Sequence, residues 1–223
     1  MAKGAGLEIL EHIEERLKQI RRTSVENLAA FEREWQTLEL LLTFARREIR
    51  SVADVVDLGC GGRELEAGAI ARRIQYRGFD IDDGNLDFDP ISLAPQTADL
   101  VVALALIEHL HNPSNFLRES YRILRPGGVL YISTPNWKYS WKTFFDNPAH
   151  VQPYSHSSIR VLLEAYGFEN VQVVPGLRGK RRAAYLGKSA FTRAALRPFR
   201  GPGFPSFLTG RATSMFALGV KPR

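Results

Sequence analysis

A glycine-rich turn that directly follows a short apolar segment limits this chain to a small set of folds. The residues are Val55-Val56-Asp57-Leu58-Gly59-Cys60-Gly61-Gly62-Arg63. An apolar run that ends in closely spaced glycines is typical of the point where a buried strand turns into a helix. Ligands bind at the carboxyl ends of the strands in open α/β sheets, so the turn is predicted to line a ligand site.

Short β-rich runs alternate with helical stretches after residue 52. Strands are predicted over residues 53–57, 76–80, 99–105, 129–133, 171–174 and 214–220, and helices over 64–73, 115–124 and 157–166. Strands that alternate with helices indicate parallel βαβ units. The predicted fold class is therefore α/β, a doubly wound and mostly parallel sheet with helices on both faces.

The first 50 residues have a different pattern from the rest of the chain. Apolar residues recur there at spacings of three and four, which predicts two helical pieces, and Thr23 and Glu26 form a capping-box signature between them. We therefore expect an N-terminal helical extension over 1–50 and an α/β domain over 51–223, with a basic insertion at about 177–211.

Composition excludes several classes of protein. Hydrophobic residues make up 44% of the chain and charged residues 24%, as in an ordinary folded protein. With one cysteine and no Cys/His group at structural-zinc spacing, the sequence predicts neither a disulfide nor a metal site. The longest apolar run, residues 100–107, is too short to span a bilayer, and acidic residues interrupt the N-terminus. The expected location is the cytoplasm.

The net charge of +6 is unevenly distributed. Every acidic residue lies at or before Glu169, whereas 11 of the 30 Lys and Arg residues follow it. Nine of these lie in 177–211, where they alternate with Phe and Tyr residues. Such a stretch could bind a phosphate-bearing or lipid-linked acceptor, an anionic membrane surface or nucleic acid, or it could simply be a solvated surface.

The residues around the turn favour a ligand that carries adenosine and no phosphate. Gly59 and Gly61 allow close approach of the backbone, and Asp80, 21 residues after Gly59, stands where an acid receives ribose hydroxyls. A dinucleotide-binding motif needs glycine at the position of Glu64, whose carboxylate would repel a pyrophosphate. A cationic ligand would instead be attracted to Asp57. S-adenosylmethionine meets these requirements.

Several ordered motifs together resemble the class I S-adenosylmethionine-dependent methyltransferases, in the branch of ubiquinone-biosynthesis and sugar methyltransferases. The resemblance spans roughly 53–174. It rests on residues 55–61, 78–82, 98–102, 106–110, 122–128, 133–136, 150–155 and 166–168.

The resemblance implies a seven-stranded sheet whose last strand runs antiparallel, with S-adenosylmethionine as the cofactor. The implied cofactor-binding residues are Asp57, Gly59, Cys60, Gly61, Asp80, Ile81, Asp89 and Ala105. Among these, Asp80 would bind the ribose, Ile81 would pack on the adenine, and Asp89 is favoured over Asp87 for the adenine amino group. Two departures from the family pattern stand out: Arg63 replaces the usual third glycine, and only 18 residues separate Asp80 from Asp99.

Methyl transfer to a hydroxyl is helped by a general base, and histidine is the side chain best suited to that role near neutral pH. His150 and His109 are the candidate catalytic residues, because both follow predicted strands at the carboxyl edge. Their alternatives are a loop histidine bonded to backbone and a histidine packed beneath the cofactor. Trp137, Tyr139 and Tyr154 are the candidate acceptor-binding residues, and the alternative is a hydrophobic cluster that closes the core.

The predicted function is O-methylation of a glycan precursor or another small polar metabolite. One alternative is an RNA methyltransferase that uses the basic insertion. The Asn/Asp-Pro-Pro-Tyr signature of base amino-methyltransferases is absent, since Ala105-Leu106-Ile107-Glu108 stands in its place, which disfavours nucleic acid. Another alternative is a non-catalytic module that keeps the fold.

Overall fold

The computed structural model describes residues 26–176 and 213–223. Its helices are α2 (Glu26–Leu42), α3 (Glu66–Ala71), α4 (Pro113–Ile123), α5 (Trp137–Ser140) and α6 (His156–Ala165). Its strands are β1 (Asp54–Leu58), β2 (Gln75–Phe79), β3 (Ala98–Leu104), β4 (Leu124–Pro135), β5 (Glu169–Pro175) and β6 (Ser214–Val220). Short 3-10 turns are η1 (Thr43–Ala45), η2 (Ile49–Ser51), η3 (Ile81–Asp83), η4 (Ile107–His109) and η5 (Phe144–Asp146).

The strands form one sheet in the order β2-β1-β3-β4-β6-β5. β1 pairs in parallel with β2 and β3, and β3 pairs in parallel with β4. β6 runs antiparallel to both β4 and β5. The predicted α/β class, the mostly parallel sheet and the antiparallel last strand are confirmed.

The sheet has six strands within the described residues, whereas seven were expected. Along the chain, the missing strand would come after β2 and before β3. The chain forms η3 there and then an irregular segment. Pro90 and Pro95 stand in this short connection, and proline cannot donate a ladder hydrogen bond. Arg122 on α4 donates instead to the carbonyls of Ile91 and Leu93, at 2.8 and 2.7 Å. β2 is therefore the edge strand.

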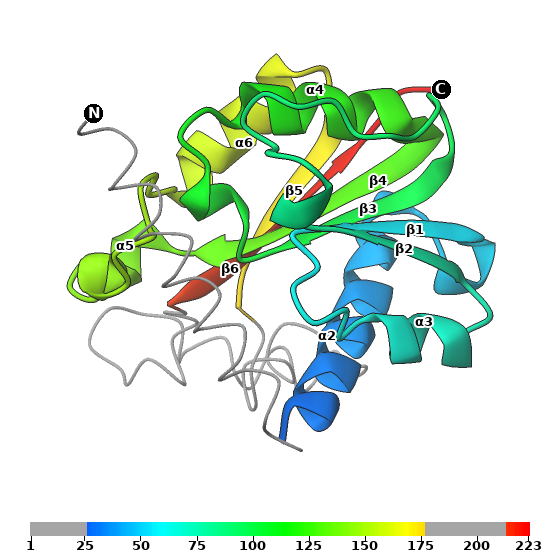
Figure 1. Ribbon diagram of the computed structural model, residues 1–223, viewed down its shortest axis with the longest axis horizontal. Coiled ribbons are helices and arrows are strands. Elements are labelled where there is room, and N and C mark those ends of the chain that lie inside the picture. Colours follow the sequence, from blue (N-terminus) through cyan, green and yellow to red (C-terminus); the bar gives the residue numbers. More distant parts are fainter. Residues whose placement is uncertain (1–25, 177–212) are drawn as a thin grey trace, which may run out of the picture.

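Helices cover both faces of the sheet (Figure 1). Val56 of β1 packs in the core beneath α4 and α6, while its neighbour Val55 packs in the core beneath α2 and α3. This alternation is the two-residue period of a strand buried on both sides. Asn112 caps α4 through a hydrogen bond from Ser114 N, and Ser155 begins α6 with a capping box.

α2 covers much of the sheet face on which α3 also lies. Trp35 is 2% exposed, and its indole Nε1 donates to the carbonyl of Leu65 at 3.0 Å. A Cβ on Gly68 of α3 would lie 2.3 Å from the indole ring, so only glycine lets the two helices approach this closely. Arg72 also donates to Glu32 and Glu39, at 2.8 and 2.6 Å. α2 therefore packs into the same core as the sheet.

The predicted strands and helices of residues 53–174 all appear, with ends shifted by at most a few residues except for β4, which starts five residues earlier than predicted. The first helical piece, the Thr23 end of the capping box and the basic insertion over 177–211 lie outside the described residues. Within the described ranges, no helix is long and apolar enough to cross a membrane.

Candidate functional site

The glycine turn after β1 is held against the end of β2. Gly59 N and Cys60 N both donate to the carbonyl of Phe79, at 2.8 and 3.1 Å. Gly59 and Gly61 have φ angles of 71° and 51°, a left-handed conformation that favours glycine. A Cβ on Gly59 would lie 2.9 Å from Cδ1 of Leu106, which follows β3. The turn therefore packs closely against the residues after β3.

Asp80 joins the turn to the connection after β2. Gly61 N donates to Oδ2 of Asp80 at 2.5 Å, and Ile81 N donates to Oδ1 at 2.7 Å. The backbone N of Asp80 in turn donates to Asp83 at 2.9 Å, which completes a capping box at η3. Asp80 is partly exposed, and the Ile81 side chain beside it is 43% exposed. The structure thus brings Gly61, Asp80 and Ile81 together.

Arg63 adopts the conformation that the family's third glycine would allow. Its φ is 59°, a left-handed value that is uncommon for a residue with a side chain. Its guanidinium forms two 3.0 Å hydrogen bonds to the Glu66 carboxylate. The departure from the family pattern therefore keeps a left-handed turn and adds an ion pair on its outer side.

Asp57 lies at the base of the turn and is 3% exposed. Tyr76 on β2 donates its hydroxyl to Oδ2 of Asp57 at 2.8 Å. Burial raises the pKa of the Asp57 carboxyl to about 7, and the negative charges of Glu64 and Asp80 act in the same direction. Burial also raises the pKa of the Cys60 thiol to about 12, so Cys60 stays protonated and packs against Gly78.

The buried Asp57 makes stability depend on pH. Its folded pKa is above that of an unfolded aspartate, so its carboxyl destabilises the fold increasingly as pH rises towards 7. We expect Asp57→Asn, which still accepts the Tyr76 hydrogen bond, to raise the free energy of unfolding by up to about 4 kcal/mol at about pH 8 and by less than half of that at about pH 5. Urea unfolding of both proteins at the two pH values measures this; an equal difference at both would contradict it.

The other predicted cofactor residues occupy different positions. Ala105 is exposed at the end of β3 with φ of 50°, and its N donates to Ser133 O at 2.8 Å. Asp89 is exposed and accepts from Asn85 N at 2.8 Å. Asp87, the alternative to Asp89, is 8% exposed and accepts from Asn112 N at 2.8 Å. Asp87 therefore fixes the start of α4, and the role of Asp89 stays a prediction.

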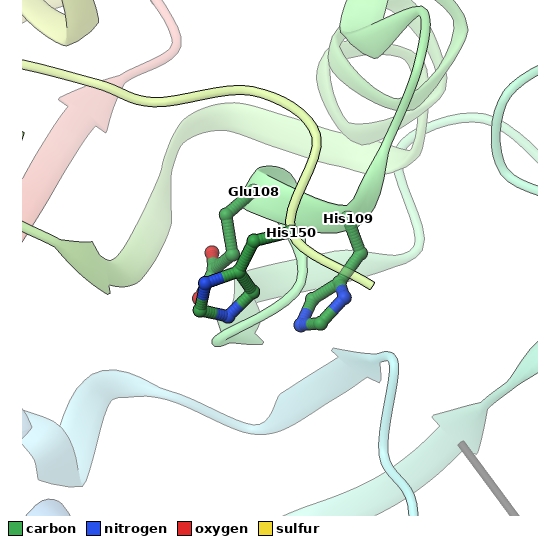
Figure 2. A group of neighbouring side chains, drawn as sticks. All are labelled: Glu108, His109 and His150. Carbon is green, nitrogen blue, oxygen red and sulfur yellow. The ribbon is translucent and has the colours of Figure 1, made fainter. Parts of the chain in front are cut away.

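The two candidate catalytic histidines lie together with a glutamate, and we call Glu108, His109 and His150 the histidine cluster (Figure 2). Glu108 and His109 belong to η4, just after β3, and His150 comes from the loop after η5. The His109 and His150 ring centroids are 4.9 Å apart. Val151 N and Gln152 N donate to the backbone O of Glu108, at 2.9 and 3.0 Å, which joins the two segments.

Trp137, one of the three candidate acceptor residues, belongs to an aromatic group next to the histidine cluster. The Trp137 ring lies 5.5 Å from that of Phe144, and the Phe144 ring lies 4.6 Å from that of His150. Tyr139 is 36% exposed. Tyr154 is 4% exposed and packs in the core beneath α6, while its backbone O accepts from Trp137 N at 2.9 Å. Acceptor binding by these residues stays a prediction.

Two residues that shape this region were not among the predicted site residues. Glu108 is fully buried within the histidine cluster, and Leu106 packs on Gly59. An available signal was the adjacency of Glu108 and His109 directly after a buried strand, with His150 in a later loop on the same edge.

Comparisons with known proteins agree with this geometry. Residues 29–173 match the family described as methyltransferase domain. A probable S-adenosylmethionine-dependent methyltransferase of Mycolicibacterium smegmatis is 36% identical over 137 residues, which are 52% of each protein. A ubiquinone biosynthesis O-methyltransferase of Dechloromonas aromatica is 30% identical over 102 residues, 37% of this chain and 44% of that protein. The chain thus spans about half the length of these relatives.

A solved structure gives the same fold. The S-adenosylmethionine-dependent methyltransferase from Archaeoglobus fulgidus has a TM-score of 0.63 and 19% identity, with 92% of this chain and 98% of that chain covered. Because the family match covers more than half of the chain, and includes the glycine turn, Asp80 and the histidine cluster, the chain belongs to the methyltransferase-domain family.

Proposed function

We propose that this protein transfers the methyl group of S-adenosylmethionine to a hydroxyl of a small polar acceptor, such as a glycan precursor. The observation that carries the proposal is the bond between Gly61 N and the Asp80 carboxylate, which places a partly exposed acid directly beside a glycine turn. This is an adenosine-binding arrangement at the carboxyl edge of a parallel sheet.

The residues of the turn suit that cofactor. The Asp80 carboxylate accepts backbone hydrogen bonds from Gly61 N and Ile81 N, and a carboxylate at this position is the acceptor that a ribose hydroxyl needs. Ile81 offers an exposed apolar surface for a flat ring. Glu64 adds negative charge near the turn, and Glu66 already engages the guanidinium of Arg63. This charge balance favours a cation over a pyrophosphate.

In the proposed reaction the protein mainly binds, orients and excludes water. When bound, the cofactor supplies a methyl group on a positively charged sulfur, which keeps the electron pair of the broken bond. Asp80 and Ile81 hold the adenosine part, whereas Gly59, Gly61 and Ala105, which directly follows β3, line the methionine end. The histidine cluster acts on the acceptor, and the surface formed by Trp137 and Tyr139 binds it.

Two features support a small hydroxyl acceptor. The Dechloromonas aromatica relative is named as an O-methyltransferase of ubiquinone biosynthesis. The histidine cluster also brings two imidazoles and a carboxylate to the carboxyl edge, where a hydroxyl needs help to lose its proton.

A transfer assay with methyl-labelled cofactor tests the proposal. The acceptor panel contains nucleotide-sugars, lipid-linked glycans, hydroxylated aromatic metabolites and total RNA. We expect label in a hydroxyl compound of low molecular mass. Label in RNA, with a steep salt dependence of RNA binding, would replace the proposal by RNA methylation. Cofactor binding without labelling of any acceptor class would indicate a non-catalytic module.

His150→Ala separates acceptor chemistry from cofactor binding. We expect transfer to fall by about 10²-fold or more, since a side chain that assists proton removal contributes about that much, while affinity for S-adenosylhomocysteine stays within about twofold. The matched control is His111→Ala, because the His111 side chain is 64% exposed and pairs with Asp87. Full activity of His150→Ala would remove His150 from the reaction.

A further inference from the structure

The histidine cluster has the composition and spacing of a metal site. One ligand atom each from Glu108, His109 and His150 lies within 4.8 Å of the others. Glu108 is fully buried, and the two histidines are partly exposed. Figure 2 shows the three side chains projecting to one side from the two adjoining segments. Two imidazoles and one carboxylate are a ligand set typical of first-row transition metals.

Hydrogen bonds fix both imidazoles in the form that binds metals. His109 Nδ1 contacts the carbonyl of Ala149 at 3.0 Å, and His150 Nδ1 contacts the carbonyl of Phe144 at 2.7 Å. A carbonyl oxygen only accepts, so each Nδ1 carries the hydrogen, and Nε2 of the neutral ring keeps a lone pair. Metal-binding histidines are generally oriented by such a bond from their other ring nitrogen.

The carboxylate is held in place by its neighbours. Thr134 on β4 donates its hydroxyl to Oε2 of Glu108 at 2.8 Å. The backbone bonds from Val151 and Gln152 to Glu108 O tie the segment of His150 to η4. A carboxylate removed fully from water is costly unless hydrogen bonds and opposite charge compensate it.

The spacing requires a small closure on binding. Ligand atoms that lie about 2.1 Å from one ion are about 3.4 Å apart in tetrahedral coordination, so a separation at the upper limit of the observed 4.8 Å spacing closes by about 1.4 Å. Rotation of a partly exposed imidazole covers such a shift. Three protein ligands leave positions open for an acceptor or water, as in catalytic metal sites.

We propose that Glu108, His109 and His150 bind one divalent transition-metal ion, which holds and polarises the acceptor hydroxyl. The role in the reaction rests on the proposed function, but ion binding does not. With Nε2 of His150 bound to the ion, His150 assists proton removal through the ion and not as a base. The hydroxyl's proton passes to water, and the oxygen keeps the electron pair with which it bonds to the methyl carbon. The sequence predicted no metal site, because no Cys/His group has the spacing of structural zinc ligands along the chain. The three ligands proposed here come from two separate segments that meet only in the fold.

Calorimetry with Zn²⁺ and electron paramagnetic resonance with Mn²⁺ test the site on the full chain after treatment with a chelator. We expect one ion per chain, and at least about tenfold weaker binding in Glu108→Gln, His109→Ala and His150→Ala, by comparison with the effects of losing supporting residues at metal sites. Glu108→Gln keeps the size of the side chain and the Thr134 hydrogen bond. His111→Ala is the control for an exposed histidine and should bind the ion like the wild type.

The same samples separate this inference from the proposed function. No binding of either ion by the wild type, or equal binding by the wild type and the three cluster variants, overturns the metal site. Affinity for S-adenosylhomocysteine, measured in parallel, shows that each variant is folded. Methyl transfer that survives chelation with no ion bound refutes the metal role while the methyltransferase stands. An ion bound without any S-adenosylhomocysteine binding refutes the methyltransferase while the metal site stands.

Discussion

Replacing Asp80 by alanine is expected to weaken the binding of S-adenosylhomocysteine by about 10²-fold or more. In the proposed binding mode the variant removes the acceptor of the ribose hydroxyls, and a hydrogen bond to a charged group contributes about 1.5–3 kcal/mol. It also removes the bond from Gly61 N, while Gly59 N and Cys60 N still hold the turn to Phe79 O at the end of β2. Isothermal titration calorimetry at constant pH and salt measures the change.

Two further variants show which of these losses matters. Asp80→Asn keeps an oxygen acceptor for Gly61 N and should lose less affinity than Asp80→Ala. Asp82→Ala changes an exposed neighbour in η3 and should bind like the wild type. If Asp80→Ala bound with unchanged affinity, the adenosine-binding role of the turn would be wrong.

Truncation of Trp35 is expected to have the largest effect on stability. The side chain is buried, donates to Leu65 O and packs against Gly68, and the Arg72 guanidinium carbon lies 5.1 Å from the ring centroid. Trp35→Ala should lower the free energy of unfolding by about 3–5 kcal/mol, as is usual for a large aromatic residue removed from a core. Urea unfolding measures the loss.

The matched control is Trp141→Ala, since Trp141 is 56% exposed. It should change the free energy of unfolding by less than about 0.5 kcal/mol, as surface substitutions usually do. A loss below about 1 kcal/mol for Trp35→Ala would mean that α2 adds little to the core, contrary to its packing against β1, β3 and β4.

The fold could be predicted from local patterns because buried strands and capped helices leave strong signals in a sequence. β6 begins and ends where the apolar run of 214–220 predicts, and the glycine turn stands directly after β1. The seventh strand is the exception. Its expectation came from the family resemblance, whereas Pro90 and Pro95 in a short connection disfavour a strand.

The site could be predicted only where its residues follow one another along the chain. Gly61 and Asp80 were recognised from a motif and a spacing, and the structure joins them by a hydrogen bond. The histidine cluster was predicted in part, because each histidine was judged alone as a base. Its third member, Glu108, meets His150 only through the return of the chain after η5, which no local pattern encodes.

We propose that the carboxyl edge of this sheet binds a cationic adenosine compound that carries no phosphate. Calorimetric titration of the wild-type protein with S-adenosylmethionine, S-adenosylhomocysteine and NAD tests this proposal directly. We expect one binding site per chain for each of the first two ligands and no heat of binding with NAD. Binding of NAD without binding of either S-adenosyl compound would contradict it.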